Sequence, residues 1–179
     1  MPQVCLLQMD ATRLAFRAET FEHIFCANAI FYFPEAAGEF YRLLRPGGQV
    51  GISSVAPGSL DWNFEVMAPY LPKDEDPNED QNKEEPAINA AEGLMRLLSR
   101  AGFEQVRVLE EEAVFEYADE AAWWSTMWSI GLRFQLERIP AESLDLVKND
   151  LYRKLADFRV GSRLVIPIRV LYAFGLRPG

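Results

Sequence analysis

Two periods of apolar residues alternate along this chain. Short apolar runs, rich in β-branched and aromatic residues, predict buried strands at residues 4–9, 23–30 and 49–55. Apolar residues at helical spacing predict helices at residues 34–44 and 87–101. The first half of the chain therefore reads strand, strand, helix, strand, helix, which is the order of an α/β sheet with helices on its faces.

The second half is less regular. Residues 104–117 predict either a strand pair or one long bent strand. Two helices are expected at residues 120–138 and 141–158, separated by Pro140, and a last strand at residues 163–174. Residues 59–71 carry a short helical pattern that stops at a proline.

A helix-to-strand corner lies between the predicted helix at residues 34–44 and the strand that follows it. Pro46 cannot continue a helix, and Gly47 and Gly48 supply the backbone freedom that a tight reversal needs. The sequence therefore passes from helix to strand within a few residues.

The length of the chain indicates one domain, and its charge argues against two classes of binding partner. A chain of 179 residues with 49% hydrophobic residues is long enough for one domain with a sizeable core. The formal net charge of −9 argues against a nucleic-acid surface and against binding to anionic membranes. The two cysteines, Cys5 and Cys26, lie in apolar runs, which favours free thiols in a reducing cytoplasm. No secretory leader or spanning segment is expected.

An acidic segment at residues 72–86 supplies much of the charge. It holds seven acids, two lysines and three prolines, with no large apolar residue, so we expect an exposed mobile loop. A lid over a binding site and a docking site for a basic partner are the two functional alternatives.

The ordered motifs resemble the second half of the class I S-adenosylmethionine-dependent methyltransferases of the small-molecule, Rossmann-like kind. The matching segments are Asp10-Ala11, Leu14-Ala15-Phe16, Thr20-Phe21-Glu22, the Arg42-to-Gly48 corner "RLLRPGG", "LLSRAGFEQVRV" and the closing "RVLYAFGLRP". Single pieces such as Pro-Gly-Gly are weak, but the series at these spacings is specific.

This resemblance implies a sheet with the strand order third, second, first, fourth, fifth, seventh, sixth. The sheet is expected to be mainly parallel, with an antiparallel strand near the carboxyl terminus and helices on both faces. The glycine-rich cofactor loop and the acid after the second strand have no counterpart here, since no Gly-x-Gly occurs. We therefore expect a single truncated domain over residues 1–179, with a helical insert at residues 118–160 as a cap on the acceptor pocket.

Without the first two strands, the fourth strand at residues 23–30 becomes an open, apolar edge. Three outcomes are expected: the third strand at residues 4–9 slides over to pair with it, a partner chain covers it in a homo- or hetero-oligomer, or the chain is a poorly soluble fragment.

The resemblance also implies site residues. Asp10 would accept a hydrogen bond from the adenine amino group of S-adenosylmethionine, with Ala11 beside it; a plain turn-capping aspartate is the alternative. Asn28 and Ala29, at the end of the fourth strand, would face the methionyl part and the transferred methyl group, although a structural amide fits Asn28 equally well. Because the cofactor brings the reactive carbon, no catalytic residue is predicted. No metal site is expected, since a second histidine and a cysteine spacing are lacking.

Clustered aromatic residues suggest an apolar pocket for a small-molecule acceptor. The pocket residues predicted are Phe31, Phe33, Trp62 and Trp124. Core packing of helices explains the tryptophans around residue 124 equally simply. Two functions remain open: a small-molecule methyltransferase, present as its carboxyl-terminal part and inactive alone, or a non-catalytic remnant or subunit that pairs with another chain.

Overall fold

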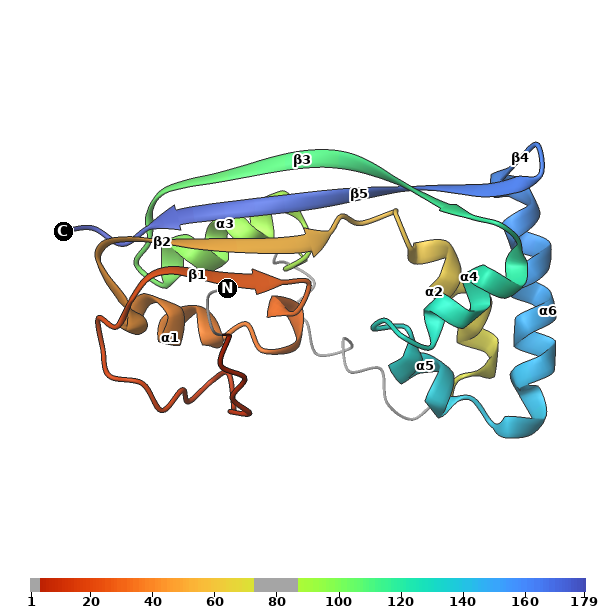
Figure 1. The fold of residues 1–179 in the computed structure, drawn as a ribbon, viewed down its shortest axis with the longest axis horizontal. Helices are drawn as coiled ribbons and strands as arrows, with labels where there is room; N and C mark the ends of the chain where they lie inside the picture. Colours follow the sequence, from red (N-terminus) through yellow and green to blue (C-terminus); the bar gives the residue numbers. More distant parts are fainter. Residues whose placement is uncertain (1–3, 73–86) are drawn as a thin grey trace. The chain divides into compact units, whose positions relative to one another are not determined.

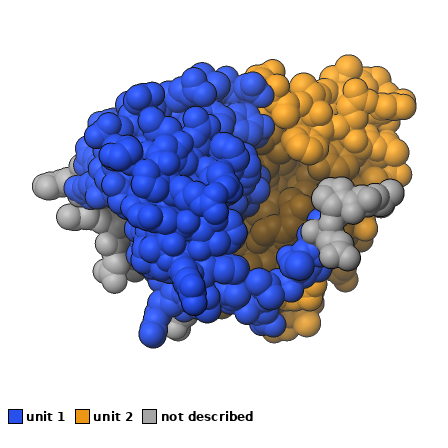
Figure 2. Space-filling view, turned by 60° about the vertical axis from the view of Figure 1, so that its left-hand side comes forward, with its two compact units in different colours: residues 1–56, 83–111, 170–179 blue, residues 57–82, 112–169 orange. Residues whose placement is uncertain are grey.

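The computed structural model describes residues 4–72 and 87–179. These residues form two compact units, which we describe separately. Unit 1 comprises residues 1–56, 83–111 and 170–179, and unit 2 comprises residues 57–82 and 112–169 (Figure 2). Whether they make up the single predicted domain stays a prediction, and the acidic segment at residues 73–86 lies outside the described residues.

Strands and helices alternate along the chain (Figure 1). The strands are β1 (Phe21–Ala27), β2 (Leu44–Val55), β3 (Glu104–Tyr117), β4 (Arg159–Val160) and β5 (Arg163–Leu176). The α-helices are α1 (Ala36–Leu43), α2 (Asp61–Met67), α3 (Ala91–Arg100), α4 (Glu120–Met127), α5 (Arg133–Arg138) and α6 (Leu144–Leu155). Among the described residues, no helix combines the length and the apolar composition that a membrane crossing requires.

The sheet has the order β1-β2-β5-β3, with the short β4 paired to β5. This is the fourth, fifth, seventh, sixth order that the resemblance implied, so the α/β, Rossmann-like fold class is confirmed. β1 and β2 pair in parallel, whereas β5 pairs antiparallel with both β2 and β4. Strands β1, β2 and β3 run in one direction and β5 runs against them (Figure 1), which is the expected mainly parallel sheet with an antiparallel strand near the carboxyl terminus.

The core of unit 1 lies on one face of its sheet. Val50 and Ile52 of β2 pack with Phe40 of α1 and with Leu94 and Leu98 of α3 in one hydrophobic cluster. β1 follows the period of two, with Cys26 buried in the cluster and Phe25 79% exposed. In unit 1 the described helices therefore cover one face, not both as predicted. In α3, Met95 is 44% exposed and lies outside the buried stripe.

The predicted strand at residues 4–9 is wrong. These residues have no strand pairing, and the side chains of Val4 and Leu6 are 82% and 90% exposed. A strand needs a neighbour for its backbone hydrogen bonds, and this segment has none in the described structure. The third strand has not moved beside the fourth, so β1 ends the strand order.

The helix-to-strand corner is confirmed, but the strand begins earlier than predicted. β2 starts at Leu44, and the register with β1 shifts between the pairs Phe21↔Leu44 and His23↔Gln49. Gly47 has a φ of 78°, and a Cβ on Gly48 would lie 2.8 Å from the carbonyl oxygen of Arg45. Gly47 is therefore needed for its positive φ, and Gly48 is needed because the Arg45 carbonyl leaves no room for a Cβ.

Arg177 fastens this corner from the end of the chain. Its carbonyl accepts from the Gly47 amide at 2.9 Å, and its amide donates to the Gly48 carbonyl at 2.8 Å. Its guanidinium donates to the carbonyls of Tyr41, Arg42 and Leu44, which are carbonyls at the end of α1, and to Glu19 at 2.9 Å. A cation at a helix carboxyl end also interacts favourably with the helix dipole.

Unit 2 is a helical cluster that includes the carboxyl-terminal part of β3 and the amino-terminal part of β5. Its buried core residues are Trp62, Met67, Trp123, Met127, Leu132, Leu136, Ile139, Val147, Leu151, Leu155, Leu164 and Ile166. The expected helix at residues 120–138 is broken into α4 and α5 by a turn through Ser129 and Gly131. The helix predicted at residues 141–158 is confirmed as α6 with a short helical turn at each end, and residues 104–117 form one long strand, β3.

Candidate functional site

The carboxyl ends of β1 and β2 lie at the same edge of the sheet, because these strands are parallel. The chain turns sharply after β1: Asn28 has a φ of 50°, and its amide donates to the Ser53 carbonyl at 2.9 Å. Asparagine tolerates this left-handed region better than most residues. The turn leaves the Asn28 side chain exposed at the edge where such sheets bind ligands.

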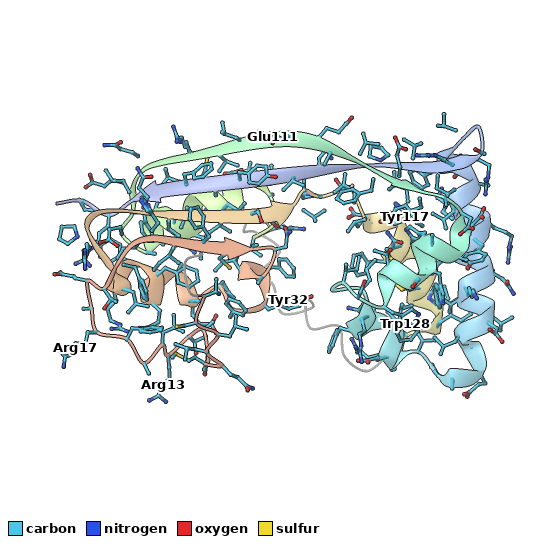
Figure 3. All side chains as sticks on the ribbon, in the orientation of Figure 1. Arg13, Arg17, Tyr32, Glu111, Tyr117 and Trp128 are labelled. Carbon is cyan, nitrogen blue, oxygen red and sulfur yellow. The ribbon has the colours of Figure 1, made fainter. Side chains whose placement is uncertain are left out.

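Ala29 closes the same turn. Its carbonyl accepts from the Tyr32 amide at 3.0 Å, which begins a short helical turn at Ile30. Phe31 and Tyr32 are exposed and their ring centroids are 4.3 Å apart (Figure 3 labels Tyr32). Phe33 turns inward and packs against the core cluster of unit 1.

Asp10 is exposed and forms a local turn with Thr12. Its Oδ1 accepts from the Thr12 amide at 2.9 Å and from the Thr12 hydroxyl at 2.8 Å. These two bonds, the backbone one first, lower the pKa of the Asp10 carboxyl. Within the described residues Oδ2 accepts no hydrogen bond. One carboxylate oxygen therefore holds the turn, and the other can accept a bond from a ligand amine.

Three of the predicted residues pack against the core cluster of unit 1. Ala11, Ala29 and Phe33 are each partly buried against it. Asp10 and Asn28, their neighbours in the sequence, are exposed.

Trp62 and Trp124 belong to unit 2. Trp62 is 8% exposed and stacks on Trp123 with ring centroids 5.7 Å apart. Its indole Nε1 is buried with no hydrogen-bond partner in the described part of the chain, as is Oδ1 of Asn63. A buried, unpaired donor is costly, so this atom is a candidate contact for a water or a ligand.

Trp124 is half-buried and packs on the cluster of unit 2. Its ring meets Trp128 edge-on, with centroids 5.9 Å apart, and Lys148 Nζ lies 5.8 Å from its centre (Figure 3 labels Trp128). This environment fits the core-packing alternative at least as well as a pocket wall.

Two side chains that contact the loop after Asp10 were not predicted from the sequence. Glu39 and Arg42 of α1 bind the backbone of the loop after Asp10, through Leu14 and Phe16. The signal was present as a Glu-x-x-Arg spacing, which places both side chains on one face of a helix. Their partners are backbone atoms about 25 residues earlier, which no side-chain pattern indicates.

No group of three or more metal-ligating side chains gathers within residues 4–72 and 87–179. Both cysteines are free, Cys5 exposed and Cys26 buried. Burial raises the pKa of the Cys26 thiol, so it is a poor nucleophile.

Known proteins resemble this chain in sequence. A methyltransferase domain family matches residues 2–52. Nocamycin O-methyltransferase of Saccharothrix syringae is 28% identical over 184 residues, covering 94% of this chain and 66% of its own length, just under two thirds. The resemblance to class I S-adenosylmethionine-dependent methyltransferases is confirmed.

Solved structures agree on the methyltransferase fold. A proposed methyltransferase from an antibiotic biosynthesis pathway of Anabaena variabilis has a TM-score of 0.55 at 18% identity, covering 96% of this chain and 74% of that one. A proposed methyltransferase of Bacillus halodurans has a TM-score of 0.51 at 19% identity, covering 97% and 78%. In methyltransferase terms, β1 and β2 are the fourth and fifth strands, and Asn28 follows the fourth.

Proposed function

We propose that this chain forms the adenine-facing and acceptor-facing part of an S-adenosylmethionine-dependent methyltransferase for small molecules. The observation that carries this proposal is that Ala11 and Ala29 both pack against the core cluster of unit 1, while their sequence neighbours Asp10 and Asn28 are exposed. Nocamycin O-methyltransferase, the relative matched over most of this chain, makes an oxygen acceptor the first class to test.

The residues present suit the adenosyl group. The cofactor would supply an electrophilic methyl group, which an acceptor lone pair attacks as the carbon–sulfur bond breaks. Asp10 Oδ2 would accept from the adenine amine, and the Asn28 amide would hold the methionyl part. The glycine-rich loop has no counterpart in this sequence, so we expect weak binding and no turnover by the chain alone.

Calorimetry with S-adenosylhomocysteine tests the proposal. We expect submillimolar binding by the unaltered chain and a roughly 10-fold loss with Asp10→Asn, which removes the charge that accepts the amine bond. Asp119→Asn is the matched control, because Asp119 accepts from the Ala122 amide at 2.8 Å in a similar local turn in unit 2. Equal effects of both substitutions, or no binding by the unaltered chain, would refute the proposed cofactor role.

The acceptor pocket is a separate part of the proposal. The unpaired Nε1 of Trp62 supports a contact with a polar acceptor atom inside the aromatic cluster of unit 2. All four tryptophans belong to unit 2, so tryptophan fluorescence reports on this unit alone. Quenching by a phenolic acceptor that Trp62→Phe abolishes would support the contact; equal quenching in the variant would contradict it.

A second candidate function is pairing with another polypeptide, favoured by the open edge of β1. Phe25, exposed on the uncovered face, lies opposite Gly51 of β2 in the strand register, and a Cβ on Gly51 would meet its ring at 2.9 Å. Added strands and helices would bury this surface. We expect concentration-dependent association in analytical ultracentrifugation that Phe25→Glu abolishes and Phe64→Glu, at an exposed phenylalanine of unit 2, does not. A monomer at all concentrations would exclude self-pairing.

The free thiols of both cysteines support a reducing, cytoplasmic location, which we also propose.

A further inference from the structure

Glu39 and Arg42 form a hydrogen-bonded pair on α1 that also holds the loop preceding β1. Arg42 Nε donates to Glu39 Oε1 at 2.9 Å, and Nη2 donates to Oε2 at 2.7 Å, so the guanidinium grips the carboxylate with two bonds. The side chains are 37% and 20% exposed, which limits screening by water. Such a bidentate pair fixes both side chains in one orientation.

The pair uses its remaining hydrogen-bonding capacity on the loop backbone. Glu39 Oε2 accepts from the Leu14 amide at 3.1 Å, and Arg42 donates to the carbonyls of Leu14 and Phe16, both at 3.0 Å. Leu14 is thus held at both its N–H and its C=O, as a residue in a sheet would be. The loop takes its backbone partners from a helix instead of a strand.

The geometry needs these residue types. Four donations from one side chain in two directions require the planar fork of arginine, which lysine lacks. The spacing of three positions on α1 places the carboxylate and the guanidinium side by side. By contrast, Arg13 and Arg17 in the loop itself point away from the sheet (Figure 3).

The held segment begins four residues after Asp10. The Arg13 amide donates to the Asp10 carbonyl at 3.1 Å, so the Asp10 turn runs directly into the gripped Leu14. Because residues 4–9 have no strand pairing to fix Asp10 from its other side, the loop is its anchor in the described structure. We propose that Glu39 and Arg42 are positioning residues that set the placement of Asp10 and Ala11 for the adenosyl group.

This inference rests on the proposed function, but its first test needs no cofactor. Amide hydrogen exchange by NMR compares the unaltered chain with Arg42→Lys and Glu39→Gln. We expect the Leu14 amide to exchange at least about 10-fold faster and the Thr12 amide, inside the Asp10 turn, at least about 3-fold faster. Arg17→Lys, the same substitution on the outward-facing side of the loop, should change neither rate.

A faster Leu14 amide with an unchanged Thr12 amide would overturn the inference, because the grip would then stop short of Asp10. Circular dichroism checks that each variant is folded, and Glu39→Gln, which keeps the shape of the side chain, serves if Arg42→Lys fails to fold.

The second test uses S-adenosylhomocysteine. If the unaltered chain binds it, Arg42→Lys should raise the dissociation constant at least about 5-fold while Arg17→Lys leaves it unchanged; unchanged affinity in Arg42→Lys would overturn the inference. If the unaltered chain does not bind, the proposed cofactor role fails, and the two amide rates alone decide whether the pair positions Asp10.

Discussion

The two units hold themselves together by different means. In unit 1, charged side chains fix the backbone: Arg42 and Arg177 between them donate to five carbonyls, and both also pair with a glutamate. In unit 2, aromatic rings contact one another in the core: Trp62 stacks on Trp123 and meets the ring of Phe158 at a tilt. Some buried polar atoms of unit 2 make no hydrogen bond within the described residues, among them Nε1 of Trp62 and Oδ1 of Asn63.

The two kinds of packing suit two different kinds of ligand contact. A loop that presents polar groups to a fixed ligand needs a defined backbone, and bidentate arginines supply it at many atoms at once. A cluster of rings with a few unpaired polar atoms is better suited to adaptable apolar contacts. The proposed cofactor contacts accordingly belong to unit 1, and the proposed acceptor contact belongs to unit 2.

The largest expected effects come from the two cores. Leu98→Ala in unit 1 and Leu151→Ala in unit 2 remove side chains that are fully buried, so each should cost about 2–5 kcal/mol of unfolding free energy. Urea unfolding followed by circular dichroism and by tryptophan fluorescence checks this, because the fluorescence reports on unit 2. We expect Leu98→Ala to shift the fluorescence transition less than Leu151→Ala does. Equal shifts would show that the cores unfold as one.

Arg177→Met tests whether hydrogen bonds from a charged side chain to the backbone stabilise unit 1. It removes one donor from each of the carbonyls of Tyr41, Arg42 and Leu44, and we expect a loss of about 2–3 kcal/mol, measured by urea unfolding. Arg45→Met is the control: its ion pair with Glu22 is exposed, so the loss should stay below about 1 kcal/mol. Equal losses of unfolding free energy in the two variants would show that the bonds from Arg177 to the backbone stabilise unit 1 no more than an exposed ion pair does.

Two glycines of unit 1 should respond with opposite signs. Gly48→Ala places a Cβ 2.8 Å from a carbonyl oxygen and should cost about 1–3 kcal/mol. Gly38→Ala, in α1, meets nothing within 4 Å and should stabilise by about 0.5–1 kcal/mol through higher helix propensity. Differential scanning calorimetry measures both changes as shifts in Tm. A stabilising Gly48→Ala would mean that the corner is less tightly packed than described.

The smallest effects are those of pH, and one titrating group from each unit tests them. The hydrogen bonds from Arg42 lower the pKa of Glu39, so its contribution is present above the ordinary value near pH 4.3 and is lost as pH falls through the lowered one. The hydrogen bond to Asp150, at 2.6 Å, raises the pKa of Tyr70 in unit 2, so that contribution is present below about pH 10 and is lost as pH rises through the raised one.

Glu39→Gln should therefore flatten the acid side of the stability–pH profile, and Tyr70→Phe the alkaline side. Thermal unfolding across pH 2–12 checks both, and a change on the opposite side in either variant would contradict the assignment.

Local patterns predicted most of the secondary structure, and they failed where a partner was missing. The apolar run at residues 4–9 has the composition of a strand, but composition supplies no neighbour, and the segment stays unpaired. The apolar run at residues 23–30 predicted the strand β1, yet which of its faces would be covered depends on helices elsewhere in the fold. Of the site, motifs indicated Asp10 and Asn28. The grip of Glu39 on a distant backbone amide follows from tertiary geometry that one sequence does not contain.

The backbone at Asn28 restricts the chemistry available at this corner. With a φ of 50°, the position accommodates asparagine, aspartate or glycine comfortably and few other residues. An amide, a carboxylate or a bare backbone are thus the options that evolution or an engineer has there. Changes of side-chain chemistry beyond these three will have to draw on other positions, whereas Asn28→Gly offers a clean way to delete the amide while keeping the turn.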